Sequence, residues 1–454
     1  MLRRVLLVLP LLGLAFVLSG CETSTPKPVD PVALESASDP ELLHATVKRL
    51  TDVMIRDIFS PPQAARAYAY TTIAAYEAMV PASPALRSLA GQVAALEPVP
   101  APPEAVPLHH PLAATQAAYG VAEALVFSPA EIASHRASME ERARASLPSD
   151  LVDASLAYGD AVAAHILGWI NTDGYRETRS APAYTVTDEP GRWMPTPPAY
   201  MDGVEPSWNQ IRPFALATAD QFAPPPPPPY STEPGSAFFT QVLEVYEIGQ
   251  SITEEQRAIA SFWDCNPYVM HTRGHAMFAT KKLTPGGHWI GITAIASRMR
   301  GDDYAETAEA YVRTAIALSD AFISAWDEKY RSNLIRPETV INAHIDETWI
   351  PVLQTPPFPE YTSGHSVISA AASVVLTDHF GENFAFSDTT EVEYGLPVRD
   401  FPSFEIAAEE AAISRLYGGI HYRFAAEEGL IQGRNVGQHV VDQIQTRAPA
   451  LASQ

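Results

Sequence analysis

The chain has 454 residues, of which 46% are hydrophobic and 18% are charged, and its formal net charge is −23. This balance is typical of a globular protein, and the length allows one large domain or two ordinary ones. The strongly acidic composition argues against nucleic acid as a partner, because phosphate binding requires a basic surface.

The N-terminus has the pattern of a signal peptide, with two arginines followed by a short apolar run. The run ends in a Leu-Ser-Gly-Cys sequence at Cys21, which resembles a bacterial lipobox. We therefore expect a signal peptide over residues 1–20, a lipid on Cys21 and a Pro-, Ser- and Thr-rich tether over residues 21–42. This predicts a lipid-anchored protein of the cell envelope, in the outer membrane if the host is Gram-negative. An ordinary secretory signal is the alternative.

Cys265 is the only other cysteine, so no internal disulfide can form once Cys21 is lipidated. The fold must then rest on its hydrophobic core. No later run is apolar and long enough to cross a membrane.

Apolar residues spaced three and four apart predict helices along most of the remaining chain. The expected helices cover residues 41–59, 64–80, 112–126, 129–145, 150–171, 236–249, 253–263, 288–299, 302–333, 364–380, 404–417 and 423–446. No segment shows convincing strand-type alternation. The sequence predicts an all-α fold of bundled helices, with an N-terminal helical part over residues 43–235 and a C-terminal catalytic part over residues 236–454.

Proline recurs between residues 175 and 235, including six in a row from Pro224, and proline is excluded from helix interiors. An extended arm, a lid and a Pro-rich recognition segment are the possible interpretations. Aromatic residues interleave with the prolines at Trp193, Trp208, Phe214 and Phe222. They favour an arm that packs against the helices through these rings.

Three short segments near the C-terminus contain cations and histidines. In the first, Lys329 and Arg336 are seven residues apart, so on one helix they lie on nearly the same face. Pro337 then ends or bends that helix. Two cations that leave a helix end in the same direction could grip one oxyanion, whereas a solvated basic face is the alternative.

The second segment contains Ser363, Gly364 and His365, just before a helix that reads as buried. Thr362 or Ser363 is the expected N-cap. Free backbone N–H groups at a helix start, together with a glycine, form a cradle for an anion. His365 would lie at its rim.

The third segment contains Arg415 and His421, with Gly418 and Gly419 between them. The glycines let the backbone turn, so the two side chains need not follow helix spacing. A lone histidine is more often a hydrogen-bonded core residue than a ligand.

In this order the three segments resemble the signature of the superfamily of phosphatidic-acid-type phosphatases, bacterial acid phosphatases and vanadium haloperoxidases. That signature reads Lys-x6-Arg-Pro, then Pro-Ser-Gly-His, then Ser-Arg-x5-His. A looser resemblance to bacterial haloperoxidase-like proteins covers residues 191–200 and 261–289. The resemblance implies helical bundles of the acid phosphatase and haloperoxidase type, with Pro-rich arms.

The resemblance also implies a vanadate cofactor and a role for each motif residue. His421 would be the axial ligand of the metal, and His365 would act as acid and base. Phe358, five residues before Ser363, would lie near the halide. The residues that would bind the oxygens of the cofactor are Lys329, Arg336, Ser363, Gly364 and Arg415.

Two positions depart from the family pattern. Thr362 replaces the usual proline before Ser-Gly-His, and Ala425 stands where the family often has an aspartate that supports the final histidine. Glu427 and Glu428 are the candidates to replace that aspartate.

The leading hypothesis is a haloperoxidase that uses hydrogen peroxide, a halide and an organic acceptor. An acid phosphatase that works through a phosphohistidine is the second hypothesis, because a site for five-coordinate vanadate also suits a phosphoryl transition state. A non-catalytic envelope lipoprotein on the same scaffold is the third. Helical faces often form dimers, so a homodimer is a further expectation.

A basic segment upstream adds another feature. We expect it to form a loop near the active site, with a surface patch or a second metal site as alternatives. Its residues are His271, Arg273, His275, Lys281, Lys282 and His288.

Overall fold

The structure is a computed structural model, and it describes residues 30–104, 106–273, 276–279 and 282–448. The predicted signal peptide and the predicted lipidation site Cys21 lie outside the described residues. Within the predicted tether, Pro31–Ala37 form a short helix, α1.

Helices dominate the described chain, which confirms the all-α prediction. Three of them, α1, α7 (Tyr175–Ser180) and α12 (Pro337–His344), are not predicted from the sequence, because a helix of eight residues or fewer is too short to show a clear apolar period. The others are α2 (Glu41–Arg56), α3 (Pro61–Met79), α4 (His110–Leu125), α5 (Ala130–Ser146), α6 (Ser149–Ile170), α8 (Ala237–Ser251), α9 (Glu254–Phe262), α10 (Pro285–Arg300), α11 (Tyr304–Ser332), α13 (Gly364–Phe380), α14 (Phe404–Tyr417) and α15 (Arg423–Gln443). None of the described helices is both long and apolar enough to span a membrane.

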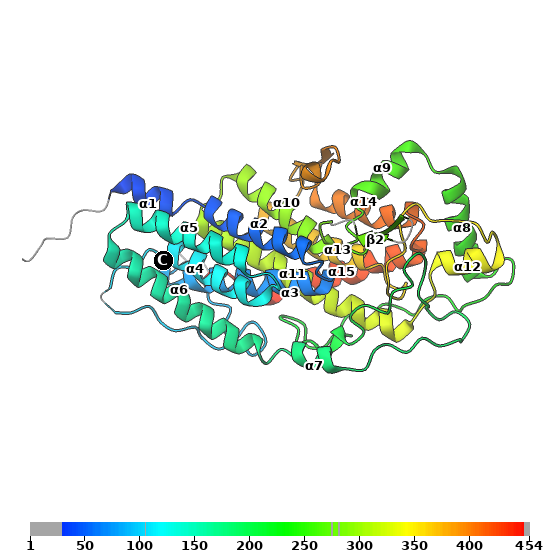
Figure 1. The fold of residues 1–454 in the computed structure, drawn as a ribbon, viewed down its shortest axis with the longest axis horizontal. Helices are drawn as coiled ribbons and strands as arrows, with labels where there is room; N and C mark the ends of the chain where they lie inside the picture. The colour runs from blue at the N-terminus through cyan, green and yellow to red at the C-terminus, as the bar shows by residue number, and fades with distance from the viewer. Residues whose placement is uncertain (1–29, 105, 274–275, 280–281, 449–454) are drawn as a thin grey trace, which may run out of the picture.

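The molecule is elongated, with α4, α5 and α6 towards one end and α8, α9 and α12 towards the other (Figure 1). The central helix is α11, which is buried along almost its whole length and packs against α3, α10, α13 and α15. A capping box formed by Asp303 and Glu306 starts α11. It ends at Asn333, whose φ of 50° and ψ of 42° are left-handed, a conformation that asparagine tolerates.

Helices α13 and α15 approach each other unusually closely through glycines of α15. A Cβ at Gly433 would lie 2.1 Å from the carbonyl oxygen of Val367, and one at Gly437 would lie 2.7 Å from that of Ala371. Only glycine permits this backbone contact. The contact fixes the position of α13, whose N-terminus carries the Ser-Gly-His segment.

Among the described residues, two small antiparallel sheets interrupt the helices, whereas the sequence predicts no strand. Strand β1 (Met270–Arg273) pairs with β2 (Ala276–Ala279), and β3 (Phe386–Asp388) pairs with β4 (Arg399–Phe401). Strands of three or four residues are too short to show a clear alternation of polar and apolar residues.

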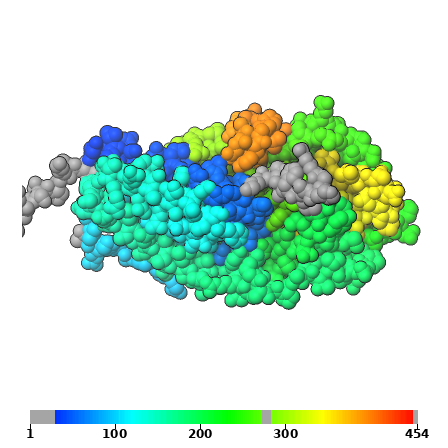
Figure 2. Space-filling model, in the orientation of Figure 1, coloured from blue at the N-terminus to red at the C-terminus, as the bar shows by residue number. Residues whose placement is uncertain are grey.

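The Pro-rich segment is an extended arm with two short helices, α7 (Tyr175–Ser180) and η2 (Trp208–Gln210), and it covers much of the lower part of the face in Figure 2. Trp193, Trp208 and Phe214 are buried, as expected of rings that fix an arm. The carboxylate of Asp320 on α11 accepts hydrogen bonds of 2.7–3.0 Å from the N–H groups of residues 214–216. The arm is thus fastened to the central helix by polar as well as apolar contacts.

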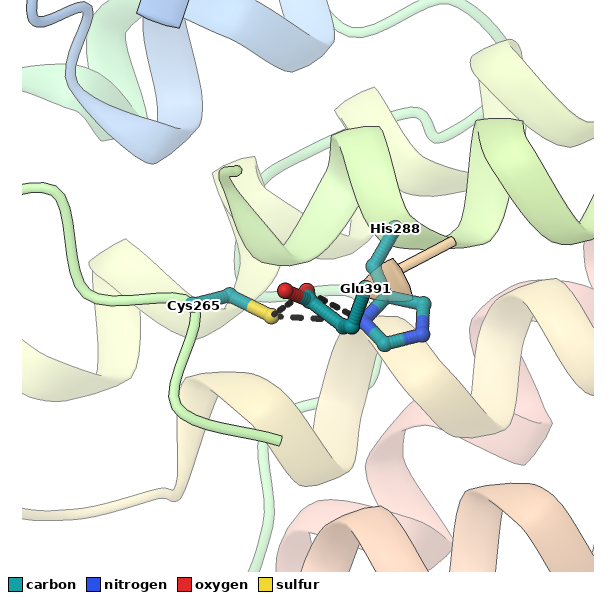
Figure 3. Close-up of side chains that lie close together, drawn as sticks. All are labelled: Cys265, His288 and Glu391. Carbon is teal, nitrogen blue, oxygen red and sulfur yellow. Dashed lines mark hydrogen bonds and ion pairs between the residues drawn. The ribbon is translucent and has the colours of Figure 1, made fainter. Parts of the chain in front are cut away.

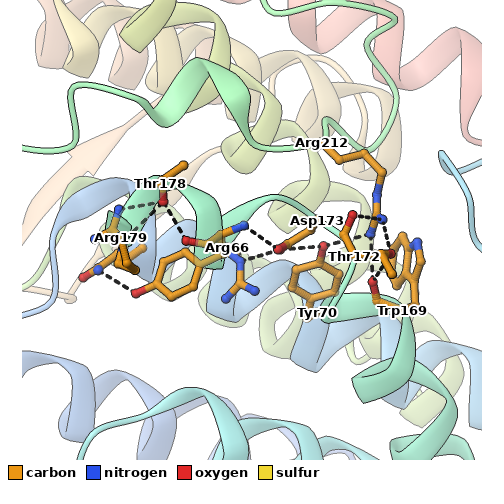
Figure 4. A network of polar contacts seen from close by, with 10 residues as sticks. Arg66, Tyr70, Trp169, Thr172, Asp173, Thr178, Arg179 and Arg212 are labelled. Atoms are coloured by element: carbon orange, nitrogen blue, oxygen red, sulfur yellow. Dashed lines mark hydrogen bonds and ion pairs between the residues drawn. The ribbon is translucent and has the colours of Figure 1, made fainter. Parts of the chain in front are cut away.

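A second polar network ties the arm to α3 (Figure 4). Asp173, which follows α6, accepts from Arg66 Nε at 2.6 Å and from the Tyr70 hydroxyl at 3.0 Å. Arg212 of the arm donates to the Tyr70 hydroxyl at 3.2 Å and to Thr172 Oγ1 at 2.8 Å. The buried charges of this network are therefore paired, as burial requires.

Candidate active site

Lys329 lies in the last turn of α11, fully buried. Its ammonium group donates to three backbone carbonyl oxygens, those of Pro359 and Glu360 at 3.1 Å and that of Thr362 at 2.6 Å. Burial, followed by the nearby charge of Arg336, holds the pKa of Lys329 well below its usual value.

The prediction that Lys329 and Arg336 share one helix face is wrong. The left-handed conformation of Asn333 ends α11, and Arg336 is the N-cap of the next helix, α12 (Pro337–His344). Pro337 begins α12 at its first position, where a missing N–H costs no hydrogen bond, rather than ending α11. The two cations reach the same region from separate helices.

The guanidinium of Arg336 is fully buried, and it is held by two backbone carbonyl groups. Nε donates to the carbonyl oxygen of Phe358 at 2.9 Å, and Nη1 donates to that of Ile420 at 2.8 Å. Nη1 also lies 3.1 Å from Nε2 of His421. Nη2 has no hydrogen-bond partner among the described residues, although it is buried. An orphaned charged donor of this kind is costly unless a ligand satisfies it.

The Ser-Gly-His segment begins α13, with Ser363 as the N-cap. Ser363 Oγ accepts from the N–H of Ser366 at 3.3 Å and from its hydroxyl at 2.9 Å, so the Ser363 hydroxyl hydrogen is available as a donor. A Cβ at Gly364 would lie 3.4 Å from the Trp326 ring and 3.6 Å from Cε of Lys329. Both distances are ordinary van der Waals contacts, so the backbone at the helix N-terminus lies close to the tryptophan and to the lysine.

His365 is the next residue of α13 and lines the same pocket. It hydrogen bonds to the backbone of Trp263, and its Nε2 is buried with no partner among the described residues. Because a carbonyl oxygen only accepts, Nδ1 carries the hydrogen and Nε2 carries the lone pair of the neutral ring. Burial, followed by the charge of Arg415, holds the pKa of His365 well below its usual value.

Arg415 lies in the last turn of α14 and His421 follows in the loop before α15. Gly419 turns the chain between them with a φ of 75°, and a Cβ there would lie 3.0 Å from the Trp349 ring. Arg415 is buried and donates from Nη2 to the carbonyl oxygen of Trp263 at 2.6 Å. The local turn brings arginine and histidine to one pocket despite their sequence separation.

A carboxylate that the sequence analysis missed supports His421. Nδ1 of His421 lies 2.8 Å from Oε1 of Glu360, which also accepts from the Tyr422 N–H at 3.0 Å. Neither of the expected substitutes for the family's aspartate does this, because Glu427 is exposed and pairs with Arg423 instead, and Glu428 forms no described contact with His421. The signal available in the sequence was a glutamate directly before Tyr-Thr-Ser-Gly-His, and the structure shows that this glutamate is buried.

Hydrogen bonding by Glu360 fixes the state of His421. A carboxylate accepts, so Nδ1 of His421 carries the hydrogen and Nε2 carries the lone pair. This lone pair accepts from Nη1 of Arg336 at 3.1 Å, and it is the one that could bind a metal instead. Burial, followed by the charges of Arg336 and Lys329, holds the pKa of His421 well below its usual value. Burial raises the pKa of Glu360 to about 7, although the same two cations oppose this shift.

The pocket beside these groups has apolar walls. Phe358 forms one of them, with its ring centroid 5.1 Å from Lys329 Nζ and 5.1 Å from the Arg336 guanidinium. Its ring packs against that of Trp326 at 5.0 Å. The residues lining the pocket include Pro61, Cys265, Phe322, Trp326, Pro356, Phe358, Gly364, His365, Arg415, Ile420 and His421.

The site fits a tetrahedral oxyanion. Lys329, Arg336 and Arg415 donate to backbone carbonyl groups rather than to carboxylates, so their charges are not neutralised by direct ion pairs. Arg336 Nη2 and His365 Nε2 are buried without partners among the described residues. A bound anion would accept from Nη2 of Arg336 and offset the desolvation that lowers the pKa of each cation, and a protonated oxygen of that anion would donate to Nε2 of His365.

The structure describes only part of the basic segment at 271–288. His275 and Lys281 lie outside the described residues. His271 is exposed, and Lys282 pairs with Asp264. His288 is fully buried in the first turn of α10, where its ring stacks on Trp263 at 4.6 Å.

The comparisons with known proteins agree with this geometry. Residues 309–448 match the family profile described as the VCPO second helical-bundle domain. The crystal structure of the first bacterial vanadium-dependent iodoperoxidase superposes with a TM-score of 0.87 and 53% identity, covering 91% of this chain and 98% of that one. A search of curated proteins finds no match.

A holo-type bacterial vanadium-dependent chloroperoxidase shares the fold, with a TM-score of 0.66 and 17% identity over 85% of this chain and 93% of that one. The chain belongs to the vanadium-dependent haloperoxidase family. It is therefore an oxidoreductase with a vanadate cofactor and with hydrogen peroxide and a halide as substrates, which confirms the leading hypothesis.

Proposed function

We propose that this haloperoxidase oxidises iodide in preference to bromide and chloride. The observation that carries this proposal is the apolar wall of the pocket, in which Trp326 and Phe358 stand beside the buried cations. Chloride is the most strongly hydrated of the three halides, so it loses the most hydration free energy on entering such a pocket. Iodide is large, polarisable and the easiest to oxidise. The relative with 53% identity is described as an iodoperoxidase.

We assign the binding of the cofactor to the residues around the oxyanion space. Lys329, Arg336 and Arg415 would balance the charge of vanadate, and Ser363 with the Gly364 amide would donate hydrogen bonds to its oxygens. Nε2 of His421 would bind the metal. Bound vanadate supplies a Lewis-acidic centre that activates hydrogen peroxide towards attack by halide.

His365 would transfer the proton that hydrogen peroxide loses during the reaction. Its ring is neutral at neutral pH because burial and Arg415 lower its pKa, and its Nε2 lone pair faces the pocket without a partner among the described residues. This nitrogen would accept a proton from incoming hydrogen peroxide and return it to the oxygen that leaves as water. The net reaction consumes peroxide, halide and one proton and yields hypohalous acid and water, and an organic acceptor would then react with the acid.

One set of assays tests the halide preference. With vanadate and hydrogen peroxide, we expect triiodide formation at a kcat/KM about 100-fold above bromination of monochlorodimedone, which corresponds to about 2.7 kcal/mol. Equal or faster bromide turnover would contradict the proposal. Hydrolysis of nitrophenyl phosphate that vanadate inhibits, without halide oxidation, would instead support the phosphatase hypothesis. Inactivity in both assays would support the non-catalytic lipoprotein.

We further propose that a lipid on Cys21 anchors the protein in the cell envelope, in the outer membrane of a Gram-negative host. The lipobox-like sequence at Cys21 supports this proposal. Cells grown with labelled palmitate should incorporate label into the full chain but not into a Cys21→Ser variant. Equal labelling of both would contradict it. The homodimer remains a prediction.

A further inference from the structure

A second cluster of potential ligands lies beside the active site and takes no part in the proposed chemistry. Cys265, His288 and Glu391 point towards one another from three separate segments (Figure 3). Cys265 follows α9, His288 lies in the first turn of α10, and Glu391 lies between β3 and the short helix η3 (Val392–Tyr394). All three are buried, with exposed fractions of 1%, 0% and 6%.

The distances between the three ligand atoms match those around one tetrahedral ion. Sγ of Cys265 lies 3.4 Å from Nδ1 of His288 and 3.7 Å from Oε1 of Glu391, and the last two atoms are 3.3 Å apart. Tetrahedral zinc, with bonds of about 2.3 Å to sulfur and 2.0–2.1 Å to nitrogen or oxygen, implies separations of about 3.5, 3.5 and 3.3 Å. Each observed separation is within a few tenths of an ångström of these values.

The surroundings of the cluster also have the form of a metal site. Nε2 of His288 lies 2.8 Å from Oδ2 of Asp388, so a carboxylate orients the histidine from the side away from the other ligands. The other Asp388 oxygen accepts from the N–H of Thr390 at 2.9 Å. Trp263 stacks on the imidazole at 4.6 Å and fixes the plane of the ring. Ligating histidines are commonly held by a second carboxylate in this manner.

We propose that Cys265, His288 and Glu391 bind one zinc ion, at a site separate from that of vanadate, with water as the fourth ligand. A thiolate, an imidazole and a carboxylate form a donor set that suits zinc. Zinc does not change oxidation state, so it tolerates the peroxide used next to it. Cys265 also lines the pocket, and zinc ligation would protect its thiolate from oxidation there.

The site would stabilise the segment that positions two active-site residues. Trp263 lies two residues before Cys265. Its backbone carbonyl oxygen accepts from Arg415 Nη2 at 2.6 Å and from the ring of His365. Zinc would join this segment to α10 and to the chain after β3. We therefore expect zinc removal to weaken vanadate binding. This second effect rests on the proposed function, whereas zinc binding itself does not.

The first test is metal analysis of the wild-type full chain, purified without chelator. We expect close to one zinc per chain by mass spectrometry. After exchange with cobalt alone, we expect a thiolate-to-cobalt charge-transfer band in the near ultraviolet. Absence of both signals would overturn the proposal and leave a metal-free cluster, in which His288 shares a proton with Asp388 and Cys265. A stoichiometric metal other than zinc would overturn the assignment of the ion.

Two variants test whether the zinc ion binds at this cluster. Glu391→Gln removes an anionic ligand while conserving shape, and we expect it to weaken zinc binding by at least about 100-fold, since loss of even an outer partner costs 10–100-fold. Glu393→Gln is the matched control, because Glu393 is two residues away, half exposed and paired with Lys48. Equal zinc affinity in both variants would contradict the site. Circular dichroism checks that each variant is folded, and the wild-type cobalt spectrum tests the proposal if Glu391→Gln does not fold.

Discussion

Replacement of His421 by alanine should lower halide oxidation by a factor of about 1000 or more. The variant loses the proposed protein ligand of vanadium, and loss of an outer partner alone costs 10–100-fold in metal sites. A thousandfold loss corresponds to about 4 kcal/mol of transition-state stabilisation. Triiodide formation measures the activity, and equilibrium dialysis of vanadate measures the loss of the cofactor.

The matched control for this prediction is His344→Ala. His344 lies in the last turn of α12, is exposed and does not line the pocket. We expect its activity to stay within twofold of wild type. If His421→Ala retained a tenth of wild-type activity at saturating vanadate, His421 would not be a ligand of the metal.

Replacement of Glu360 by glutamine should weaken vanadate binding by about 10–100-fold. The glutamine oxygen can still accept from the His421 ring and from the Tyr422 N–H, so the fold is retained. It carries no negative charge, however, and Nε2 of His421 becomes a poorer ligand. Titration of the cofactor-free protein with vanadate measures the dissociation constant directly.

The pH dependence of the Glu360→Gln variant provides a second readout. The pKa of Glu360 is raised by burial to about 7, above its ordinary value of 4.5. Protonation therefore favours the folded state, and the contribution of Glu360 to stability is present below pH 4.5 and is lost as pH rises through 7. Denaturation of the cofactor-free protein should show this decrease in wild type, and the glutamine variant should lack it.

The affinity of the wild-type protein for vanadate should rise as pH rises through 7, whereas its stability falls. Only the ionised form of Glu360 accepts the His421 hydrogen as an anion. Below pH 7, wild-type affinity should therefore fall relative to that of Glu360→Gln measured at the same pH. Comparison at equal pH removes the effect of vanadate speciation. Glu427→Gln is the control, because Glu427 is exposed on α15 and should behave as wild type. Identical pH profiles for wild type and Glu360→Gln would refute the role of Glu360.

The proposed zinc ion and Glu360 support different residues of the same pocket. Glu360 orients His421, whereas the cluster of Cys265, His288 and Glu391 would hold the segment that contacts Arg415 and His365. Loss of zinc should therefore change vanadate affinity without changing the Glu360 titration. The two effects can be measured separately in one titration series.

The amino-acid sequence by itself predicted most of the helices and the motif residues of the candidate site. Long amphipathic periods predicted α2 to α6, α8 to α11 and α13 to α15 but missed the short α1, α7 and α12, and the order of Lys329, Ser363 and Arg415 in their motifs predicted an oxyanion site. These features are local, because a helix and its caps depend on residues within a few turns of one another.

Only the tertiary structure decided which groups support the motif residues. Glu360 lies 61 positions before His421, and Cys265 lies 126 positions before Glu391, so no sequence spacing links these partners. The left-handed Asn333 likewise separated Lys329 from Arg336, although a continuous helix fitted their spacing. Contacts of this kind arise when distant segments pack together, and burial then fixes hydrogen bonds and charges that a local pattern does not encode.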